Sequence, residues 1–326
     1  MFSLSQTPGR TAIVDGKEHL FFSGYSYLGM GHVPGFIDLV KEGIDKYGWM
    51  FPSSRISNTQ LELFTQFENK LSDITGMEET VCFSSGFLAG RAVADLFRNE
   101  NFSCAPQTHP AICLEKSSAQ SYEEWKNDAA NYGVLFLESV NPLTAQINEL
   151  SFLTSASNKT IIIDDSHGAG LLNNGGRTSI LRDHKLVLTY SLSKAYNLVG
   201  GAVSCSKEIA EQLRASAFYI ASTSLSPALA YAFLKAQDLY EQQREKLRNN
   251  IKFFRQLTKN KFKSHPELPI FILDGVSEEK LQEKNIIISS FAYPDPTGNK
   301  INRAVLNALH TQDDLQRLAD VLNGSH

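Results

Sequence analysis

A lysine follows an apolar segment at a place where a charged side chain is unusual. Residues 186–201 read LVLTYSLSKAYNLVGG, so Lys194 comes after a run typical of a buried strand and before a Gly-Gly pair. Burial disfavours the charged ammonium and lowers the pKa of an amine. The neutral amine is the form that condenses with an aldehyde to give an imine. The segment predicts a nucleophilic lysine, and a surface lysine in a strand–loop turn is the alternative.

A second apolar segment ends in an acid and a histidine. Residues 160–170 read TIIIDDSHGAG, which places Asp164 and His167 where ligands of open α/β sheets bind. A buried carboxylate can keep the pyridine nitrogen of pyridoxal 5′-phosphate (PLP) protonated, so that the ring acts as an electron sink. A nearby histidine can hydrogen-bond the phenolic oxygen of PLP. A helix N-cap at Asp164 or an Asp164/His167 metal pair are alternatives, but no further metal ligands are evident.

Two shorter segments fit the same cofactor. The stretch CFSSGFLAG runs from an apolar strand through Ser85 and Gly86 into a predicted helix, and a helix N-terminus is a ready site for a phosphate. A simple capped helix is the alternative there. The segment QTHPAI carries His109, whose flat ring could stack on a pyridine and assist proton transfer. A lone histidine before a helix is more often structural.

A sheet must bring these side chains together, and the hydrophobic pattern predicts one. Short apolar runs alternate with helical stretches, which is typical of an α/β domain with a mostly parallel sheet. The runs cover 80–83, 102–105, 133–137, 160–163, 185–188 and 202–205. Before them we expect strands at 11–14 and 20–22, a turn at 29–31, and helices at 34–47 and 61–75. After them we expect one long helix from 227 to about 257, strands at 270–273, 286–289 and 304–306, and a closing helix at 312–322.

The composition argues against several other classes of protein. The chain has 326 residues, 42% hydrophobic and 20% charged, with a net charge of −4, which leaves no basic footprint for nucleic acid or an anionic membrane. No apolar run approaches the roughly 18 residues of a membrane span, and the N-terminus lacks a signal-peptide pattern. The cysteines, Cys82, Cys104, Cys113 and Cys205, show neither zinc nor disulfide spacing. We therefore expect reduced core thiols, no metal and a cytoplasmic protein.

Over nearly its whole length the chain resembles the α-oxoamine synthases. This family of fold-type-I PLP enzymes includes 8-amino-7-oxononanoate synthase, glycine C-acetyltransferase, 5-aminolevulinate synthase and serine palmitoyltransferase. The matching motifs are YLG at 27–29, the loop YGWMFPSSR, SGF at 85–87, HPA at 109–111, the Asp-to-Gly motif at 164–170, SK at 193–194, and the Arg and His at 303 and 310.

The resemblance implies a domain organisation. We expect the PLP-dependent transferase fold of type I, an α/β large domain with a mostly parallel sheet plus a smaller C-terminal α+β domain. The expected parts are an N-terminal segment over 1–42, a PLP-binding large domain over 43–228 and a small domain over 229–326 that packs with the N-terminal segment.

The resemblance also implies roles for single residues. Lys194 would form the Schiff base and move protons, with Asp164 on the pyridine nitrogen and His167 on the phenolic oxygen. His109 would stack on the ring, supported by Glu138. Further contacts to phosphate or ring would come from Ser85, Gly86, Phe87 and Ser191, and from Ser222 and Thr223 of a neighbouring subunit in a homodimer with a shared active site. In the substrate site, Arg303 would hold a carboxylate, which suits a guanidinium fork.

Three positions depart from the family pattern. Tyr25 stands where relatives carry an asparagine near the substrate carboxylate. Pro142 stands near the place of a serine whose hydroxyl reaches the cofactor. Asn197 replaces a usual glycine, and asparagine tolerates a left-handed backbone. The catalytic core matches the family, so these changes concern the substrate pockets.

The expected activity follows from the resemblance. It is the condensation of an amino acid with an acyl thioester, carried by CoA or an acyl carrier protein, with decarboxylation to an α-amino ketone. The branch we expect is 8-amino-7-oxononanoate synthase, which serves biotin biosynthesis, ahead of a glycine C-acetyltransferase or serine palmitoyltransferase-like branch. A PLP aminotransferase or lyase, a non-catalytic PLP-binding protein and a PLP-free structural protein are the alternatives, because fold and core motifs are shared widely.

Overall fold

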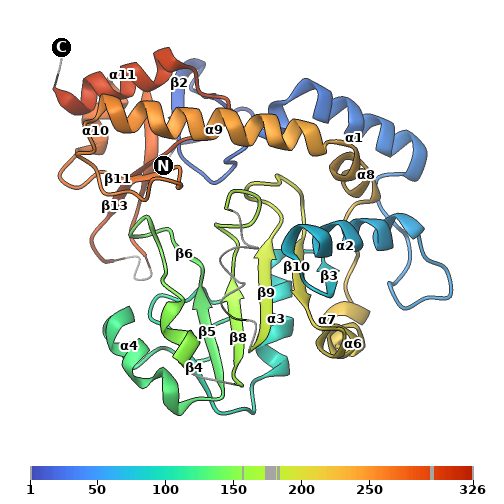
Figure 1. The fold of residues 1–326 in the computed structure, drawn as a ribbon. Coiled ribbons are helices and arrows are strands. Elements are labelled where there is room, and N and C mark those ends of the chain that lie inside the picture. Colours follow the sequence, from blue (N-terminus) through green and yellow to red (C-terminus); the bar gives the residue numbers. More distant parts are fainter. Residues whose placement is uncertain (1, 156–157, 173–180, 182–183, 294–296, 325–326) are drawn as a thin grey trace.

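The larger of two main sheets has six strands. The chain is seen in a computed structural model that describes residues 2–155, 158–172, 181, 184–293 and 297–324 (Figure 1). In spatial order the 6-stranded sheet contains β3 (Glu79–Phe83), β10 (Gly201–Cys205), β9 (Lys185–Ser191), β8 (Thr160–Asp164), β5 (Val134–Glu138) and β4 (Phe102–Cys104). Strands β4, β5, β8 and β9 are parallel, and β10 is antiparallel to both neighbours. This confirms the predicted α/β class with a mostly parallel sheet.

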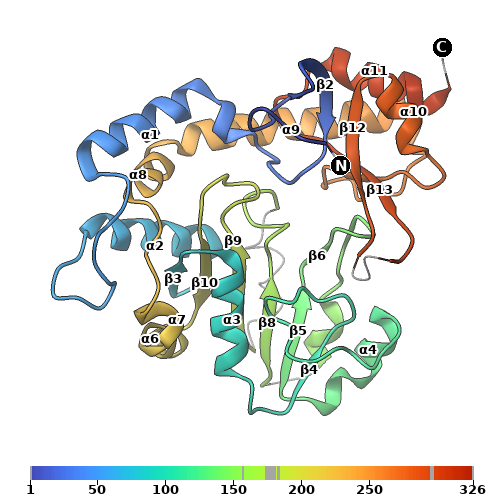
Figure 2. The ribbon, with the colours of Figure 1, turned by 180° about the vertical axis from the view of Figure 1, so that it is seen from behind.

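Helices cover both faces of this sheet, because its strands are apolar on both sides. Val81 of β3 belongs to the core cluster of α3 (Gly86–Leu96) and α6 (Lys207–Ala215), and the next residue, Cys82, belongs to the cluster of α2 (Glu62–Thr75). Figure 1 shows α2 in front of the sheet, and the reverse view in Figure 2 shows α3 in front. The alternation follows from the two-residue period of a strand.

The smaller sheet contains strands from both ends of the chain. Its order is β1 (Thr11–Val14), β2 (Lys17–Phe22), β12 (Ile286–Phe291), β13 (Ile301–Val305) and β11 (Ile270–Ile272). Strand β2 is parallel to β12, and the other pairs are antiparallel. The N-terminal segment is therefore hydrogen-bonded to the C-terminal part. The domain limits at 42 and 228 stay a prediction.

Further helices and a hairpin complete the described chain. The α-helices are α1 (Pro34–Tyr47), α4 (Tyr122–Asp128), α7 (Ala217–Ile220), α8 (Pro227–Lys235), α9 (Gln237–Leu257), α10 (Glu278–Glu283) and α11 (Gln312–Asn323). Short 3-10 helices cover Met30–His32, Ala129–Asn131 and Ser151–Ser155, and β6 (Val140–Asn141) pairs with β7 (Gln146–Ile147). In the part described, no helix is long and apolar enough to cross a bilayer.

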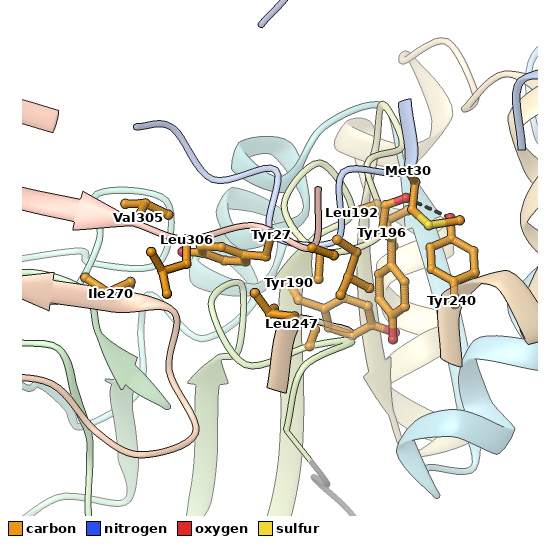
Figure 3. Packing of buried hydrophobic residues seen from close by; sticks show 14 of the residues in the cluster. Tyr27, Met30, Tyr190, Leu192, Tyr196, Tyr240, Leu247, Ile270, Val305 and Leu306 are labelled. Carbon is orange, nitrogen blue, oxygen red and sulfur yellow. Dashed lines mark hydrogen bonds between the residues drawn. The ribbon is translucent and has the colours of Figure 1, made fainter. Parts of the chain in front are cut away.

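One apolar core joins the two sheets. Tyr27 from the N-terminal loop and Leu306 from the end of β13 lie in the same cluster as Leu192, Tyr196 and Tyr240 (Figure 3). The hydroxyl of Tyr240 donates to the carbonyl of Tyr196 at 2.7 Å, which satisfies a phenol that is 1% exposed. The loop after β9 is thus packed against α9 and the smaller sheet.

The single long helix predicted from 227 to about 257 is wrong, because the helix breaks at Ala236. Ala236 has φ −97° and ψ 17° and ends α8. Nearly all of α8 is buried, whereas α9 buries one face only, with Tyr240, Leu247 and Phe254 among its inward residues. Because the two helices bury different surfaces, their axes differ. The sequence does not mark the change, since no Gly or Pro separates the apolar run of α8 from the amphipathic run of α9.

Two smaller expectations also need correction. Strand β13 begins at Ile301 instead of 304, because the half-buried Asn302 and Arg303 pair with β12 although they are polar. All four cysteines are free, but Cys113 is only partly buried and is no core thiol.

Gly43 of α1 gives a test of the packing between α1 and α8. A Cβ at Gly43 would lie 2.7 Å from the carbonyl oxygen of Ala228, which is backbone, whereas one at Gly35 would meet only the Leu239 side chain at 3.4 Å. Gly43→Ala should lower the free energy of unfolding by about 1–3 kcal/mol, because overpacking outweighs the gain in helix propensity. Gly35→Ala is the matched control and should be neutral in the same thermal or urea unfolding experiment. Equal stability of both variants would contradict the close helix contact.

His310 makes stability depend on pH. Its Nδ1 accepts from the Asn307 amide at 3.0 Å, and its Nε2 lies 3.0 Å from the Phe21 carbonyl in β2. Burial lowers the pKa of His310 to about 4, while an unfolded histidine has a pKa of about 6.5. The contribution is therefore complete above the unfolded pKa and is lost as pH falls toward the folded one, by at most about 3 kcal/mol. Urea unfolding of wild type and His310→Gln between pH 7 and pH 4 should converge on acidification; a constant difference would refute this.

Candidate active site

A cavity of about 340 Å³ opens at the carboxyl ends of β5, β8 and β9. The predicted residues that line it are Lys194, Asp164, His167, His109, Glu138, Arg303, Tyr25, Gly86, Phe87 and Ser191. The tertiary structure thus brings together side chains that are far apart in the sequence. This is the edge at which open α/β sheets bind ligands.

Strand register sets the acidic side of the cavity. Glu138 at the end of β5 pairs with Asp164 at the end of β8, which pairs with Thr189 of β9. Oδ1 of Asp164 accepts the Ser166 amide at 2.9 Å, and the Ser166 hydroxyl accepts the Ser191 amide at 2.8 Å. Asp164 is 5% exposed. A buried carboxylate held in this way is a fitting partner for a protonated ring nitrogen.

Glu138 holds the segment that carries His109. Its carboxyl oxygen accepts the backbone N–H of His109 at 2.7 Å, and Nδ1 of His109 accepts the Ala111 amide at 3.1 Å. Burial, and then Asp164, raise the pKa of Glu138 well above its usual value. Although the His109 side chain opens to the cavity, desolvation lowers its pKa. A neutral ring with its Nδ1 occupied leaves Nε2 as the protonated nitrogen.

Lys194 lies in a tight loop after β9. The Leu192 amide donates to the Gly200 carbonyl at 3.0 Å, and the Leu198 amide donates to the Leu192 carbonyl at 3.0 Å. Burial lowers the pKa of Lys194, although Asp164 and Glu138 oppose this shift. The loop therefore presents a lysine whose neutral, nucleophilic form is more accessible than that of a surface lysine.

The turn from β3 into α3 forms a close-fitting cradle. The Ser85 hydroxyl caps α3 by accepting the Leu88 amide at 3.1 Å. A Cβ on Gly86 would lie 2.6 Å from Cβ of Ser191, and one on Gly201 would lie 2.5 Å from Cα of Gly86. Only glycine fits at these two positions, so β9 and β10 press against the helix N-terminus. The Ser191 and Ser193 hydroxyls are 2.7 Å apart beside it.

These groups fit PLP. The α3 N-terminus and the serine hydroxyls suit its phosphate, Asp164 suits its ring nitrogen, and Lys194 suits its aldehyde. His167 and His109 complete the wall around a planar ring.

Arg303 reaches the cavity from β13 of the smaller sheet. Its Nη1 donates to the Pro142 carbonyl at 3.0 Å, and its guanidinium lies 4.9 Å from the centroid of the Phe291 ring. Its Nε is buried without a hydrogen-bond partner in the described part of the chain. Burial lowers the pKa of Arg303, and the nearby Tyr27 opposes that shift. A buried cation with an unused donor is suited to an anionic group of a ligand.

Three residues of the site were missed by sequence reasoning. Phe291 and Tyr293 line the cavity next to Arg303. The Tyr27 hydroxyl lies 2.7 Å from Nδ1 of His167, although Tyr27 was noted only as part of a motif. Phe291 ends β12 of the smaller sheet and Tyr293 follows it, and no local pattern tells which residues there face the larger sheet.

Ser222 and Thr223 lie outside the set of residues that line this cavity in their own chain. They belong to the segment between α7 and α8, where the Ser222 hydroxyl donates to the Phe218 carbonyl at 2.6 Å. Their predicted contact with the phosphate site of a neighbouring subunit stays a prediction.

Asn197 joins the Lys194 loop to the N-terminal loop. Its φ is 58°, in the left-handed region. Its Oδ1 accepts the Gly31 amide at 2.7 Å and the Ser26 hydroxyl at 3.1 Å, bonds that a glycine could not make. Tyr25, next to Ser26, is 51% exposed and lines both the Lys194 cavity and an adjoining one of about 340 Å³.

Comparison with known proteins gives one family and several similar folds. A family model described as aminotransferase class I and II matches residues 126–322, more than half of the chain. Serine palmitoyltransferase from Sphingomonas wittichii is 20% identical with a TM-score of 0.83, over 99% of this chain and 91% of that one. A variant of the S. paucimobilis enzyme with a PLP–myriocin aldimine bound is 19% identical, with a TM-score of 0.83, and the match covers 100% of this chain and 92% of that one. The 8-amino-7-oxononanoate synthase of Francisella tularensis is 24% identical, with a TM-score of 0.75, and the match covers 94% of this chain and 97% of that one. These likenesses show the fold and confirm the predicted one.

Two substitutions at Asn197 separate its hydrogen bonds from its backbone conformation. Asn197→Gly loses the side-chain bonds but keeps the left-handed backbone without strain, at a cost of about 1–2 kcal/mol of stability. Asn197→Ala loses the same bonds and should cost roughly 1 kcal/mol more, because a Cβ disfavours positive φ. Thermal unfolding of the three proteins should therefore rank wild type above the glycine variant and that above the alanine variant. An alanine variant as stable as the glycine variant would contradict the left-handed conformation.

Proposed function

The chain belongs to the aminotransferase class I and II family, and we propose that it is a PLP-dependent acyltransferase of the α-oxoamine synthase type. It condenses an amino acid with an acyl thioester and releases an α-amino ketone after decarboxylation. The observation that carries the proposal is the shared cavity of Lys194, Asp164, His167 and Arg303. The folds shared with serine palmitoyltransferase and 8-amino-7-oxononanoate synthase support the acyltransferase type.

Bound PLP supplies an aldehyde for the substrate amino group and a ring that withdraws electrons from the α-carbon. The residues of the chain have separate tasks around it. Lys194 provides the amine that holds the aldehyde and then moves the proton at the α-carbon, since burial lowers its pKa. Asp164 would keep the ring nitrogen protonated, and His109, whose backbone N–H donates to Glu138, would stack on the ring. Arg303, whose Nε has no partner in the described part of the chain, orients the substrate carboxylate.

The apolar part of the cavity lining suits the acyl partner. Leu143, Phe291 and Phe87 contribute apolar side chains to the lining of the cavity, which Pro142 also lines. An acyl chain bound against these side chains would share the cavity with the amino acid held by Arg303, and holding two reactants together can itself lower a barrier by several kcal/mol.

The finer features of the proposal are these. The enzyme works as a cytoplasmic homodimer with a shared active site, to which Ser222 and Thr223 of the second subunit contribute. The preferred branch is 8-amino-7-oxononanoate synthase, with alanine and a pimeloyl thioester, and a glycine C-acetyltransferase or serine palmitoyltransferase-like branch is the second candidate. The likeness to serine palmitoyltransferases extends over 99% of this chain and favours testing serine with long acyl groups as well.

The decisive experiment compares wild type, Lys194→Ala and Lys185→Ala with added PLP. Lys185 is exposed at the start of β9 and is the matched control. Wild type and Lys185→Ala should show a borohydride-reducible absorbance band, and peptide mapping should locate the reduced adduct on Lys194. Turnover should fall by roughly 10²–10⁴-fold in Lys194→Ala, because its proton transfers are lost.

Product analysis then separates the branches. Glycine, L-alanine and L-serine are each supplied with acetyl, pimeloyl and palmitoyl thioesters, and free thiol and carbon dioxide are measured. Thiol with carbon dioxide supports the proposal, and the amino acid and acyl group identify the branch. Thiol release without carbon dioxide from glycine indicates the C-acetyltransferase branch. Transamination with a keto acid and no thiol release would refute the acyltransferase, and absence of an adduct on Lys194 would refute the PLP site.

A further inference from the structure

We propose that Tyr27 is a positioning residue that fixes the tautomer of His167. Its hydroxyl occupies Nδ1 of the imidazole, so that the N–H on Nε2 points into the Lys194 cavity. The tautomer is a property of the protein without cofactor. Its consequence for ligand binding rests on the proposed function.

The hydrogen bond has one direction that leaves no donor unsatisfied. The Tyr27 hydroxyl and Nδ1 of His167 are 2.7 Å apart, and Tyr27 is 1% exposed. Within the described residues, Nδ1 of His167 is the one hydrogen-bond partner of this hydroxyl. If Nδ1 carried the proton and donated it to the phenol, the phenol proton would be left in the core without an acceptor, which is costly. The phenol therefore donates, and Nδ1 is the acceptor.

The charge states of the pair agree with this direction. Burial raises the pKa of Tyr27, so the phenol keeps its proton at neutral pH. Burial, and then the nearby Lys194 and Arg303, lower the pKa of His167 well below its usual value. A neutral imidazole carries a single N–H, and with Nδ1 occupied this N–H lies on Nε2. Because His167 lines the cavity, its donor is available to a ligand there.

Tyr27 is held firmly enough to impose this geometry. Its backbone N–H donates to the Tyr25 carbonyl at 2.8 Å, and its carbonyl accepts the Ala308 amide at 2.9 Å. Its ring lies beside Leu306 in the core between the two sheets (Figure 3). The loop after β2 and the segment after β13 thus hold the Tyr27 hydroxyl next to His167, which follows β8.

The consequence concerns which ring the cavity accepts. Asp164 offers a hydrogen-bond acceptor and His167, three positions later, offers a donor to the same cavity. Together they match an aromatic ring with a protonated nitrogen and an anionic oxygen, the charged form of a hydroxypyridine. The opposite tautomer of His167 would turn a lone pair toward that oxygen and repel it. Tyr27, which does not line the cavity, therefore acts through His167 to select the ring form in which the nitrogen keeps its proton.

Nitrogen NMR on the protein without PLP measures the tautomer directly. The protein is labelled with ¹⁵N-histidine, and the His167 signals are identified by their absence in His167→Gln. In wild type at neutral pH, Nε2 should show the shift and coupling of a protonated nitrogen, and Nδ1 those of a hydrogen-bonded lone pair. A proton on Nδ1, or an imidazolium, would overturn the proposal without any variant.

Two phenylalanine variants test the role of Tyr27. In Tyr27→Phe the Nδ1 signal should move toward that of a free lone pair with a second tautomer populated, and the dissociation constant of PLP should rise by roughly three- to tenfold, the effect of one hydrogen bond. Tyr240→Phe removes another buried phenol, one that donates to the Tyr196 carbonyl, and should leave the His167 signals unchanged. Equal changes in both variants, or none in Tyr27→Phe, would overturn the proposal.

The outcome is separable from that of the proposed function. The NMR result in the protein without cofactor decides the tautomer whether or not an acyl thioester is consumed. The expected tautomer together with failure to bind PLP would refute the proposed function and leave the hydrogen-bond assignment standing. Normal turnover together with the opposite tautomer of His167 would refute the hydrogen-bond assignment and leave the proposed function standing.

Discussion

The burial of Asp164 and Glu138 beside Lys194 at the ends of neighbouring strands is the constraint on which the rest of the site depends. Ionisable groups tolerate burial only when they are paired or neutralised. Here β5 and β8 place the two acids side by side, and the raised pKa of Glu138 and the lowered pKa of Lys194 both follow from burial first. The backbone amides of His109 and Ser166 then bind these acids, so the loops that carry His109 and His167 are tied to the same charged centre.

The remaining functional groups come from the smaller sheet and the N-terminal loop. Arg303 enters from β13, and Tyr27 enters from the loop after β2. Because β2 and β13 both pair with β12, these two side chains are attached to one sheet. The packing of Leu192, Tyr196 and Leu306 in one core holds the smaller sheet against the Lys194 loop. The positions of Arg303 and Tyr27 relative to Lys194 therefore depend on this packing.

The three positions noted in the sequence as departing from the resembled family lie near the contact between the Lys194 cavity and the smaller sheet with its N-terminal loop. Asn197 adds side-chain hydrogen bonds to the N-terminal loop that a glycine could not make. The carbonyl of Pro142 accepts a hydrogen bond from Arg303. Tyr25 stands between two adjoining cavities. These three residues lie where the N-terminal loop and the smaller sheet meet the Lys194 cavity.

The sequence by itself determined the fold class, most of the elements and the set Lys194, Asp164, His167 and His109 as candidates. It could do so because hydrophobic periodicity and strand-end polar residues are local signals, readable within about ten residues. The break at Ala236 was missed, since no Gly or Pro marks a change of axis between two helices that bury different faces. Only the tertiary structure decided three contacts. Arg303 packs against the Phe291 ring, the Tyr27 hydroxyl hydrogen-bonds His167, and the Asn197 side chain hydrogen-bonds the N-terminal loop. These contacts join segments far apart in the chain, and whether a donor meets an acceptor across them depends on distances of a few tenths of an ångström that arise only when the two sheets pack together.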